Sequence, residues 1–191
     1  MSRVVKNVWQ RYAANDCLAG VFSAGECAKI VETYSKKGWI SPEIRDQPDT
    51  EAHFRPRWIL SSDPSANWIF ERLEKAVGRW NDAGFNFKID LYESLHLVCR
   101  QPGTDTGWRS DLGTGMGSRG RLSTVAVLSS PNAYAGGGIE FVETEFGAPK
   151  FETGAGDVVV YASWLQYRFL PVTAGKFWTL STWWLGNRPL R

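Results

Sequence analysis

Histidine is scarce in this sequence, and so is excess charge of either sign. Only His53 and His96 occur among the 191 residues, and we expect each to be an ordinary structural histidine. The formal net charge is +2 and the basic residues are scattered along the chain, which argues against nucleic acid as a partner. A metal site built on two imidazoles would have to use both histidines.

Cysteine pairs and long apolar runs are also missing. Cys17, Cys27 and Cys99 form no Cys-x-x-Cys pair, and an odd number of cysteines does not make a disulfide framework. We therefore expect reduced, mostly buried thiols. No apolar run approaches the ~20 residues of a membrane span, and residues 1–6 lack the apolar core of a signal peptide. We expect a cytoplasmic protein with no membrane partner.

Several common catalytic motifs do not occur. The sequence contains no Gly-x-Ser-x-Gly nucleophile elbow and no Walker phosphate-binding loop. The glycines of residues 113–117 are not followed by a Lys-Ser/Thr pair, so this stretch indicates a loop. Cys99 has no evident histidine partner for nucleophilic catalysis.

Tryptophan, by contrast, is abundant, with ten residues in the chain. This number favours a large aromatic core or aromatic contact surfaces. With 43% hydrophobic and 22% charged residues, the composition is that of an ordinary globular protein. The length predicts one domain over residues 1–191.

The first half of the chain predicts two helices, and the second half predicts short strands. Ser23 and Glu26 form a capping box ahead of apolar residues at helical spacing. Asp63 and Pro64 suit the start of a second helix and Gly84 its end. Alternating apolar residues between turn signals then predict strands. These are residues 55–60, 85–89, 94–100, 121–128, 138–142, 157–162, 167–170 and 177–185. The order favours an α+β domain, with a β-sandwich or double-sheet jelly roll and N-terminal helices on one sheet.

Five stretches in the second half resemble, in order and spacing, motifs of one enzyme family. They are Gly-Trp-Arg-Ser-Asp at 107–111, the strand beginning Arg-Leu-Ser at 121, the Ser-Ser-Pro…Gly-Gly-Gly segment of 129–141, residues 154–161, and Pro-Val-Thr-Ala-Gly at 171–175. Together they resemble the iron(II)/2-oxoglutarate-dependent oxygenases of the prolyl 4-hydroxylase-like branch, in the short single-domain form found in bacteria and their phages. The resemblance implies a double-stranded β-helix.

The functional positions of that family carry over to five residues. The family's first iron-binding histidine falls on Arg109, its carboxylate on Asp111 and its distal histidine on Tyr167. The cation that holds the cosubstrate falls on Phe177, and a tyrosine that often contacts the cosubstrate falls on Arg100. Asp111 alone keeps the family's residue type.

This set departs from what Fe(II) chemistry needs. A facial triad binds iron through two neutral imidazoles and one carboxylate, whereas Arg109 is a permanent cation without a lone pair. Phe177 cannot hold a carboxylate. We therefore expect no bound Fe(II), 2-oxoglutarate or other cofactor, and an ion pair between Arg109 and Asp111. An all-oxygen Mg²⁺ or Ca²⁺ site from Asp105, Glu140 and Asp111 is the alternative left open.

Two functions of different classes follow from this conflict. The first is a catalytically inactive domain with a vestigial site (Arg109, Asp111, Tyr167, Phe177 and Arg100), used as a structural or protein-interaction component. Its partners would be other proteins, including copies of itself or virion components of a phage neck or tail, so its location would be the cytoplasm or a virion. The strand 177–185 and the basic tail 187–191 are the predicted contact region. The second is an oxygenase-family enzyme with altered metal or cosubstrate use, which would show a pocket with converging polar groups.

Overall fold

The structure, a computed structural model, describes residues 14–37, 56–89, 91–92, 94–103, 107–142 and 151–190, with residues 91–92 described as backbone only. His53 and Asp105 of the sequence analysis lie outside these residues.

The main sheet has seven strands, each pair of which is antiparallel. Its order is β1-β8-β5-β11-β4-β2, and β3 also pairs with β11. The longest strand, β11, lies in the middle, with β5 and β4 on its two edges. The strands are β1 (Asn15–Leu18), β2 (Arg57–Ile59), β3 (Leu91–Tyr92), β4 (Leu95–Arg100), β5 (Gly120–Val127), β8 (Val158–Ala162) and β11 (Phe177–Leu185).

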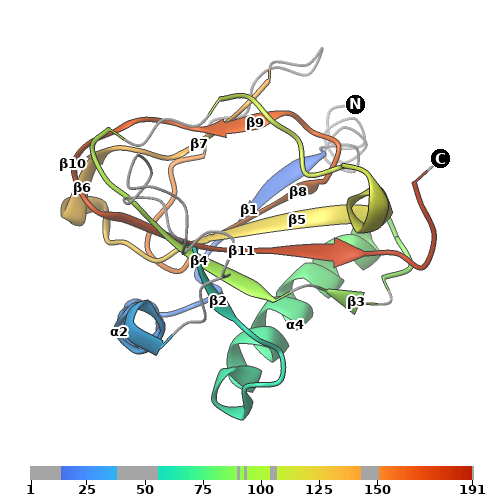
Figure 1. The fold of residues 1–191 in the computed structure, drawn as a ribbon, viewed down its shortest axis with the longest axis horizontal. Helices are drawn as coiled ribbons and strands as arrows, with labels where there is room; N and C mark the ends of the chain where they lie inside the picture. Colours follow the sequence, from blue (N-terminus) through green and yellow to red (C-terminus); the bar gives the residue numbers. More distant parts are fainter. Residues whose placement is uncertain are drawn as a thin grey trace, which may run out of the picture.

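Two small two-stranded sheets cover one face of the main sheet. They pair β10 (Val172–Gly175) with β6 (Tyr134–Gly136), and β7 (Ile139–Phe141) with β9 (Tyr167–Phe169). In Figure 1 these strands lie on one side of the main sheet, and the two helices lie on the other. A cluster of buried side chains fills the space between the sheets: Val125, Val127, Ile139, Phe141, Val159, Tyr161, Tyr167, Phe169, Val172 and Phe177.

The helices α2 (Ala24–Lys37) and α4 (Asn67–Ala83) cover the other face. The predicted capping box is confirmed, because the Ser23 amide donates to Glu26 Oε2 at 2.8 Å and the Glu26 amide donates to Ser23 Oγ at 3.3 Å. The second helix begins with a 3₁₀ turn, Pro64–Ala66, that Asp63 caps. Apolar side chains of both helices, such as Ile30 and Leu73, form a second core with the main sheet. Strand alternation thus gives the sheet two apolar faces.

Most predicted strands are confirmed within a residue or two at their ends, but the segment 85–89 forms no strand. Asn86 has a positive φ of 52°, which a strand does not permit. The side chain of Asn81 also takes up both backbone groups of Phe87, accepting from its N–H and donating to its carbonyl, each at 2.9 Å. Four strands, β1, β3, β6 and β10, were not predicted.

The fold is a mixture of helices and antiparallel sheet, as the sequence predicted. The position of β11 has a consequence for the predicted contact region. β11 pairs with β4 on one side and with β5 on the other, so a partner could reach residues 177–185 mainly through their side chains, and the contact region stays a prediction. Among the helices that the structure describes, none is both long and apolar enough to cross a membrane.

Candidate functional site

The five predicted site residues come from four places in the fold and meet between the main sheet and the β7–β9 pair. Arg109 pairs with Tyr167 of β9 through two backbone hydrogen bonds, at 3.0 and 2.8 Å. The amide of Asp111 donates to the carbonyl of Ser163 at 3.0 Å. The segment of residues 107–112 is therefore fixed along β9 and the turn before it, although 58 residues separate Arg109 from Tyr167.

Asp111 is the centre of a carboxylate–phenol network. The hydroxyl of Tyr161 donates to its Oδ2 at 2.9 Å, and the hydroxyl of Tyr167 donates to its Oδ1 at 2.8 Å. Burial raises the pKa of Tyr161 well above its ordinary value and also raises the pKa of Tyr167, with the negative charge of Asp111 adding to both effects. Both phenols therefore stay protonated and serve as donors to the carboxylate.

Arg109 does not form the expected ion pair with Asp111. Its Nε donates to the hydroxyl of Tyr167 at 3.3 Å, and its guanidinium lies 5.3 Å from the centre of the Tyr167 ring. The predicted ion pair was therefore wrong: Arg109 bonds Tyr167, and Asp111 bonds the two phenols. Arg109 itself is exposed, so it lies at the mouth of the site.

Arg100 is the most deeply buried charge of the site. It is 2% exposed, and its guanidinium carbon lies 3.3 Å from the centre of the Phe169 ring. Its Nη1 donates to Thr179 Oγ1 at 2.6 Å. Burial lowers the pKa of Arg100 to about 9, and the nearby charge of Arg109 contributes. Phe177 lies directly across from Arg100 in the sheet register, so both side chains are on one face.

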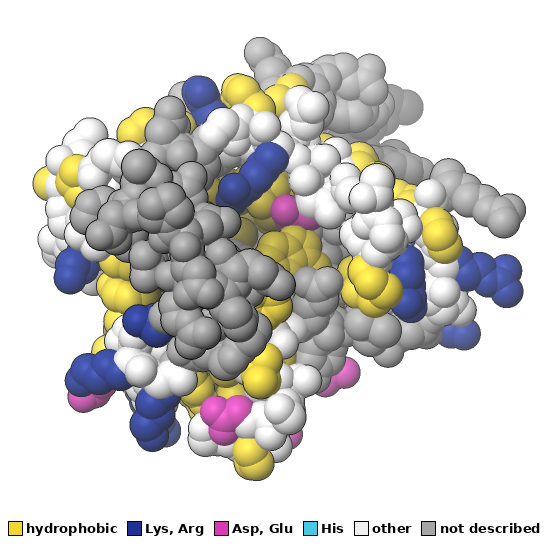
Figure 2. All heavy atoms as spheres, in the orientation of Figure 1, with side chains coloured by type: hydrophobic (Ala, Val, Ile, Leu, Met, Phe, Trp, Pro, Cys, Tyr) yellow, Lys and Arg dark blue, Asp and Glu magenta, His cyan; other side chains and the backbone are white. Residues whose placement is uncertain are grey.

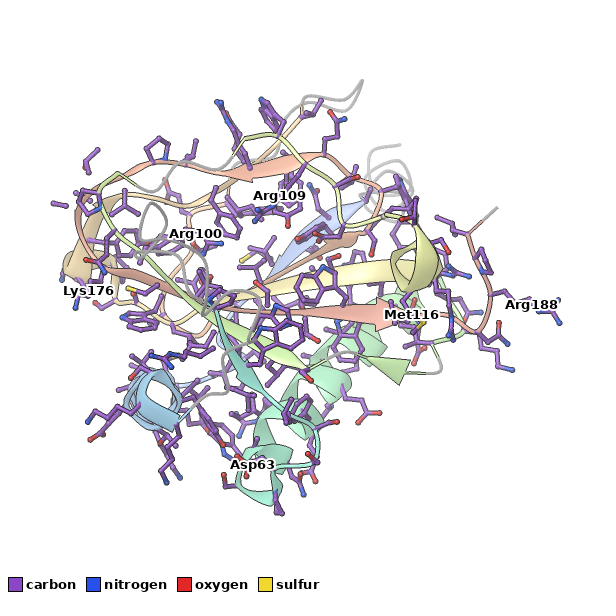
Figure 3. The ribbon with its side chains drawn as sticks, viewed as in Figure 1. Asp63, Arg100, Arg109, Met116, Lys176 and Arg188 are labelled. Carbon is purple, nitrogen blue, oxygen red and sulfur yellow. The ribbon has the colours of Figure 1, made fainter. Side chains whose placement is uncertain are left out.

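The figures show how these groups are arranged. In Figure 3, Arg100 and Arg109 lie in the space between the strands β4 and β11 and the strand β9. Figure 2 shows a hollow on this face of the molecule, where basic and acidic side chains lie beside apolar ones.

Sequence reasoning missed Tyr161 and Thr179. Strand alternation could have found Thr179, since it shares a face with Phe177, whereas Tyr161 needed the pairing of β8 with β5.

These residues do not fit an iron ion held by two imidazoles and one carboxylate. Arg109 and Tyr167 supply a cation and a protonated phenol around Asp111, and neither is a suitable ligand for Fe(II). Among the described residues, no three His, Cys, Asp or Glu side chains group closely enough to hold a metal. His96 instead packs against the rings of Trp58 and Trp183, with centroid distances of 3.9 and 4.6 Å.

The alternative of a Mg²⁺ or Ca²⁺ site gains no support from the described residues. Glu140 forms an ion pair with Arg168 at 2.7 Å, and both oxygens of Asp111 accept hydrogen bonds from tyrosines.

Comparison with known proteins finds sequence relatives but no matching family model. A PKHD-type hydroxylase of Methylobacterium nodulans is 35% identical over 131 residues, which are 65% of this chain and 57% of that protein. The chain thus spans little more than half the length of this relative. A PKHD-type hydroxylase of Paraburkholderia xenovorans is 26% identical over 165 residues, covering 83% of this chain and 72% of that protein.

Solved structures share the fold over nearly the whole chain. A Pseudomonas putida prolyl-4-hydroxylase superposes with a TM-score of 0.69 at 16% identity, covering 95% of this chain and 97% of that one. An oxidoreductase of the 2OG-Fe(II) oxygenase family from Burkholderia pseudomallei gives a TM-score of 0.71 at 16% identity, covering 97% and 92%.

These similarities correct the first of the two functional expectations. The inactive structural or virion component is contradicted, because the similar proteins are named as hydroxylases and oxygenases. The prediction gave too much weight to the replaced ligand positions and too little to the polar groups that converge beside them. The sequence relatives and the shared fold support the resemblance to the iron(II)/2-oxoglutarate-dependent oxygenase superfamily.

Proposed function

We propose that this protein is an enzyme of the oxygenase superfamily that uses its metal or its cosubstrate differently from its hydroxylase relatives. The relatives support the enzyme class, and the residues around Asp111 support the altered use. Arg109, Tyr167 and Phe177 stand where the resemblance places iron and cosubstrate ligands, and none of them can take those roles.

The observation that carries the proposal is the convergence of polar groups between two apolar sheets. Arg100, Thr179, Tyr161, Tyr167 and Asp111 meet where the surrounding cluster is otherwise aliphatic and aromatic. Burying a guanidinium costs free energy, and apolar side chains of similar volume often stabilise a core as well or better. A domain kept only for its shape gains nothing from this arrangement, whereas a binding and catalytic site does.

The chain's own residues supply proton transfer and anion binding. Asp111 is a carboxylate held in place by two phenol donors, Tyr161 and Tyr167, so it is positioned to accept a proton from a bound substrate. The aromatic walls of Phe169 and Phe177 exclude water from the floor of the site. A metal or cofactor that oxidises a substrate in this site would have to be bound by ligands other than two imidazoles.

We also propose that the main sheet and the two small sheets together form a double-stranded β-helix. Support comes from the facing arrangement of the β7–β9 and β10–β6 pairs over β8, β5 and β11, with the shared apolar cluster between them.

The test is oxygen consumption by the purified protein with a panel of divalent first-row metals and small 2-oxo acids. We expect turnover with at least one combination other than Fe(II) and 2-oxoglutarate. Asp111→Asn should lower that turnover by ~100-fold or more, as loss of an acid–base group does. Arg168→Gln is the matched control, because Arg168 lies on β9 but pairs with Glu140, away from Asp111.

Two results would contradict the proposal. One is the absence of turnover with every combination. The other is turnover with Fe(II) and 2-oxoglutarate alone, which would mean that neither metal nor cosubstrate use is altered.

A further inference from the structure

We propose that residues 107–111 form a strand edge that binds an extended segment of a partner protein as an added antiparallel strand. The partner segment carries an acidic residue opposite Arg109 and an apolar residue opposite Trp108. This inference goes beyond the proposed function, because it concerns association through the backbone and needs neither a metal nor turnover.

The first support is the direction of the backbone groups in this segment. The N–H and the carbonyl of Arg109 both bond Tyr167 of β9, at 3.0 and 2.8 Å. Successive backbone groups along an extended chain point to opposite sides, so those of Trp108 and Ser110 point away from β9. Among the residues that the structure describes, none forms a backbone hydrogen bond with Trp108 or Ser110. The segment therefore presents two N–H donors and two carbonyl acceptors along its outer side.

The second support is the exposure of this edge. The segment runs beside β9 at the rim of the molecule (Figure 1), and residues 107–110 are all exposed. Free strand edges are usually protected by proline, by lysine, by a bulge or by a covering segment. Residues 107–111 contain neither proline nor lysine, and the large apolar side chain of Trp108 is 44% exposed. An accessible edge beside an exposed indole is typical of surfaces that bind a peptide by strand addition.

The side chains on the two faces of the segment select the sequence of the partner. Arg109 lies on the side that faces the main sheet (Figure 3), and it forms no ion pair with any residue that the structure describes. A carboxylate on the directly opposite partner residue would form a favourable charge pair with it. Trp108 lies on the other face, where the guanidinium of Arg168 lies 4.7 Å from the centre of its ring. An apolar residue opposite Trp108 would cover the exposed part of the indole.

The same register argues against a second copy of this chain as the occupant. Two copies that pair this edge about a two-fold axis use the same patch on both molecules. Trp108 of one copy would then exchange hydrogen bonds with Ser110 of the other, and the two Arg109 side chains would lie directly opposite one another. Like charges directly opposite each other destabilise a strand pair. The edge therefore favours a partner with a different sequence.

The experiment is fluorescence anisotropy of a labelled, amidated peptide, Lys-Thr-Thr-Glu-Val-Thr-Lys, titrated with the full chain. With the glutamate opposite Arg109 in an antiparallel pair, the valine lies opposite Trp108 and the threonine before the glutamate lies opposite Ser110. The amides of this valine and threonine then donate to the edge, whereas the amide of the glutamate points away. We expect saturable binding that N-methylation of the valine weakens about tenfold and N-methylation of the glutamate leaves unchanged. Replacement of the glutamate by lysine should also weaken binding.

Variants of the chain test the same edge from the other side. Ser110→Pro removes an outward N–H that bonds no described residue, so it should weaken peptide binding about tenfold and change Tm little. Trp108→Ala should weaken binding of the same peptide, because the valine loses its cross-strand neighbour. Trp164→Ala is the matched control. Trp164 is similarly exposed, at 37%, but packs against Phe85 and Phe87, and its removal should leave peptide binding unchanged.

The N-methylated peptides keep the test decisive if Ser110→Pro does not fold, since they require no change to the protein. Absence of saturable binding of the unmodified peptide, equal effects of the two N-methyl groups, or unchanged binding by Trp108→Ala would overturn the inference. Sedimentation velocity tests the other occupant. A dimer of the wild type that Ser110→Pro dissociates would also overturn the inference, because the edge would then bind a second copy of the chain.

Discussion

His96 is the residue whose protonation should make the protein sensitive to acid. Burial lowers its pKa to about 4, from an ordinary value of 6.5. Between these two pH values the unfolded chain binds more protons than the folded chain, so stability is full above about pH 6.5 and falls as the pH decreases toward 4. The loss should reach about 3 kcal/mol at most. Chemical denaturation of the wild type and of His96→Phe across this range measures it, and the variant should lack this part of the pH dependence. Equal slopes in both proteins would show that His96 is not responsible.

The residue scale also shows what the sequence could not reveal about the site. Arg109, Asp111 and Tyr167 were selected by motif spacing, and the structure brings them together. In place of the expected ion pair, Asp111 accepts hydrogen bonds from Tyr161 of β8 and Tyr167 of β9, and the position of Tyr161 depends on the pairing of β8 with β5. Hydrogen-bond competition between groups from different strands is a tertiary effect, so no local pattern contains it.

Among the connections between elements, the turn before β8 depends on a glycine. Gly156 has a φ of +94°, and a Cβ there would lie 1.8 Å from the carbonyl oxygen of Phe22. The amide of Phe22 also donates to the carbonyl of Gly156 at 3.0 Å. Gly156→Ala should therefore lower the free energy of unfolding by more than about 2 kcal/mol. Gly78→Ala is the control, because Gly78 lies inside α4 with open space around it. It should instead stabilise by ~0.5–1 kcal/mol. Urea denaturation separates the two, and equal stabilities for both variants would refute the argument.

The predictability of the elements follows from how each one is stabilised. The helices and long strands carry local signals, such as the Ser23–Glu26 box and the alternation of β11, and these were predicted. Strands β6 and β10 contain glycine and alanine, and they form only because they pair with each other. β1 begins with the polar pair Asn15 and Asp16 and is held by its pairing with β8. Pairing with distant segments, rather than propensity, creates these strands.

At the scale of the whole molecule, the main sheet lies between two apolar clusters and contributes side chains to each of them. Leu180 of β11 belongs to the cluster under the helices, and Phe141 of β7 belongs to the cluster under the small sheets. The strands β5, β8 and β11 contribute side chains to both clusters. Removing apolar contacts from either cluster should therefore destabilise the same main sheet. Leu180→Ala should cost ~2–5 kcal/mol and Phe141→Ala ~3–5 kcal/mol, each from the apolar contacts removed and the cavity left. Each variant should still unfold in one transition that is followed identically by circular dichroism and tryptophan fluorescence. A separate early transition in Phe141→Ala would mean that the small sheets unfold independently. The site between the sheets would then be formed by two units of unequal stability rather than by one.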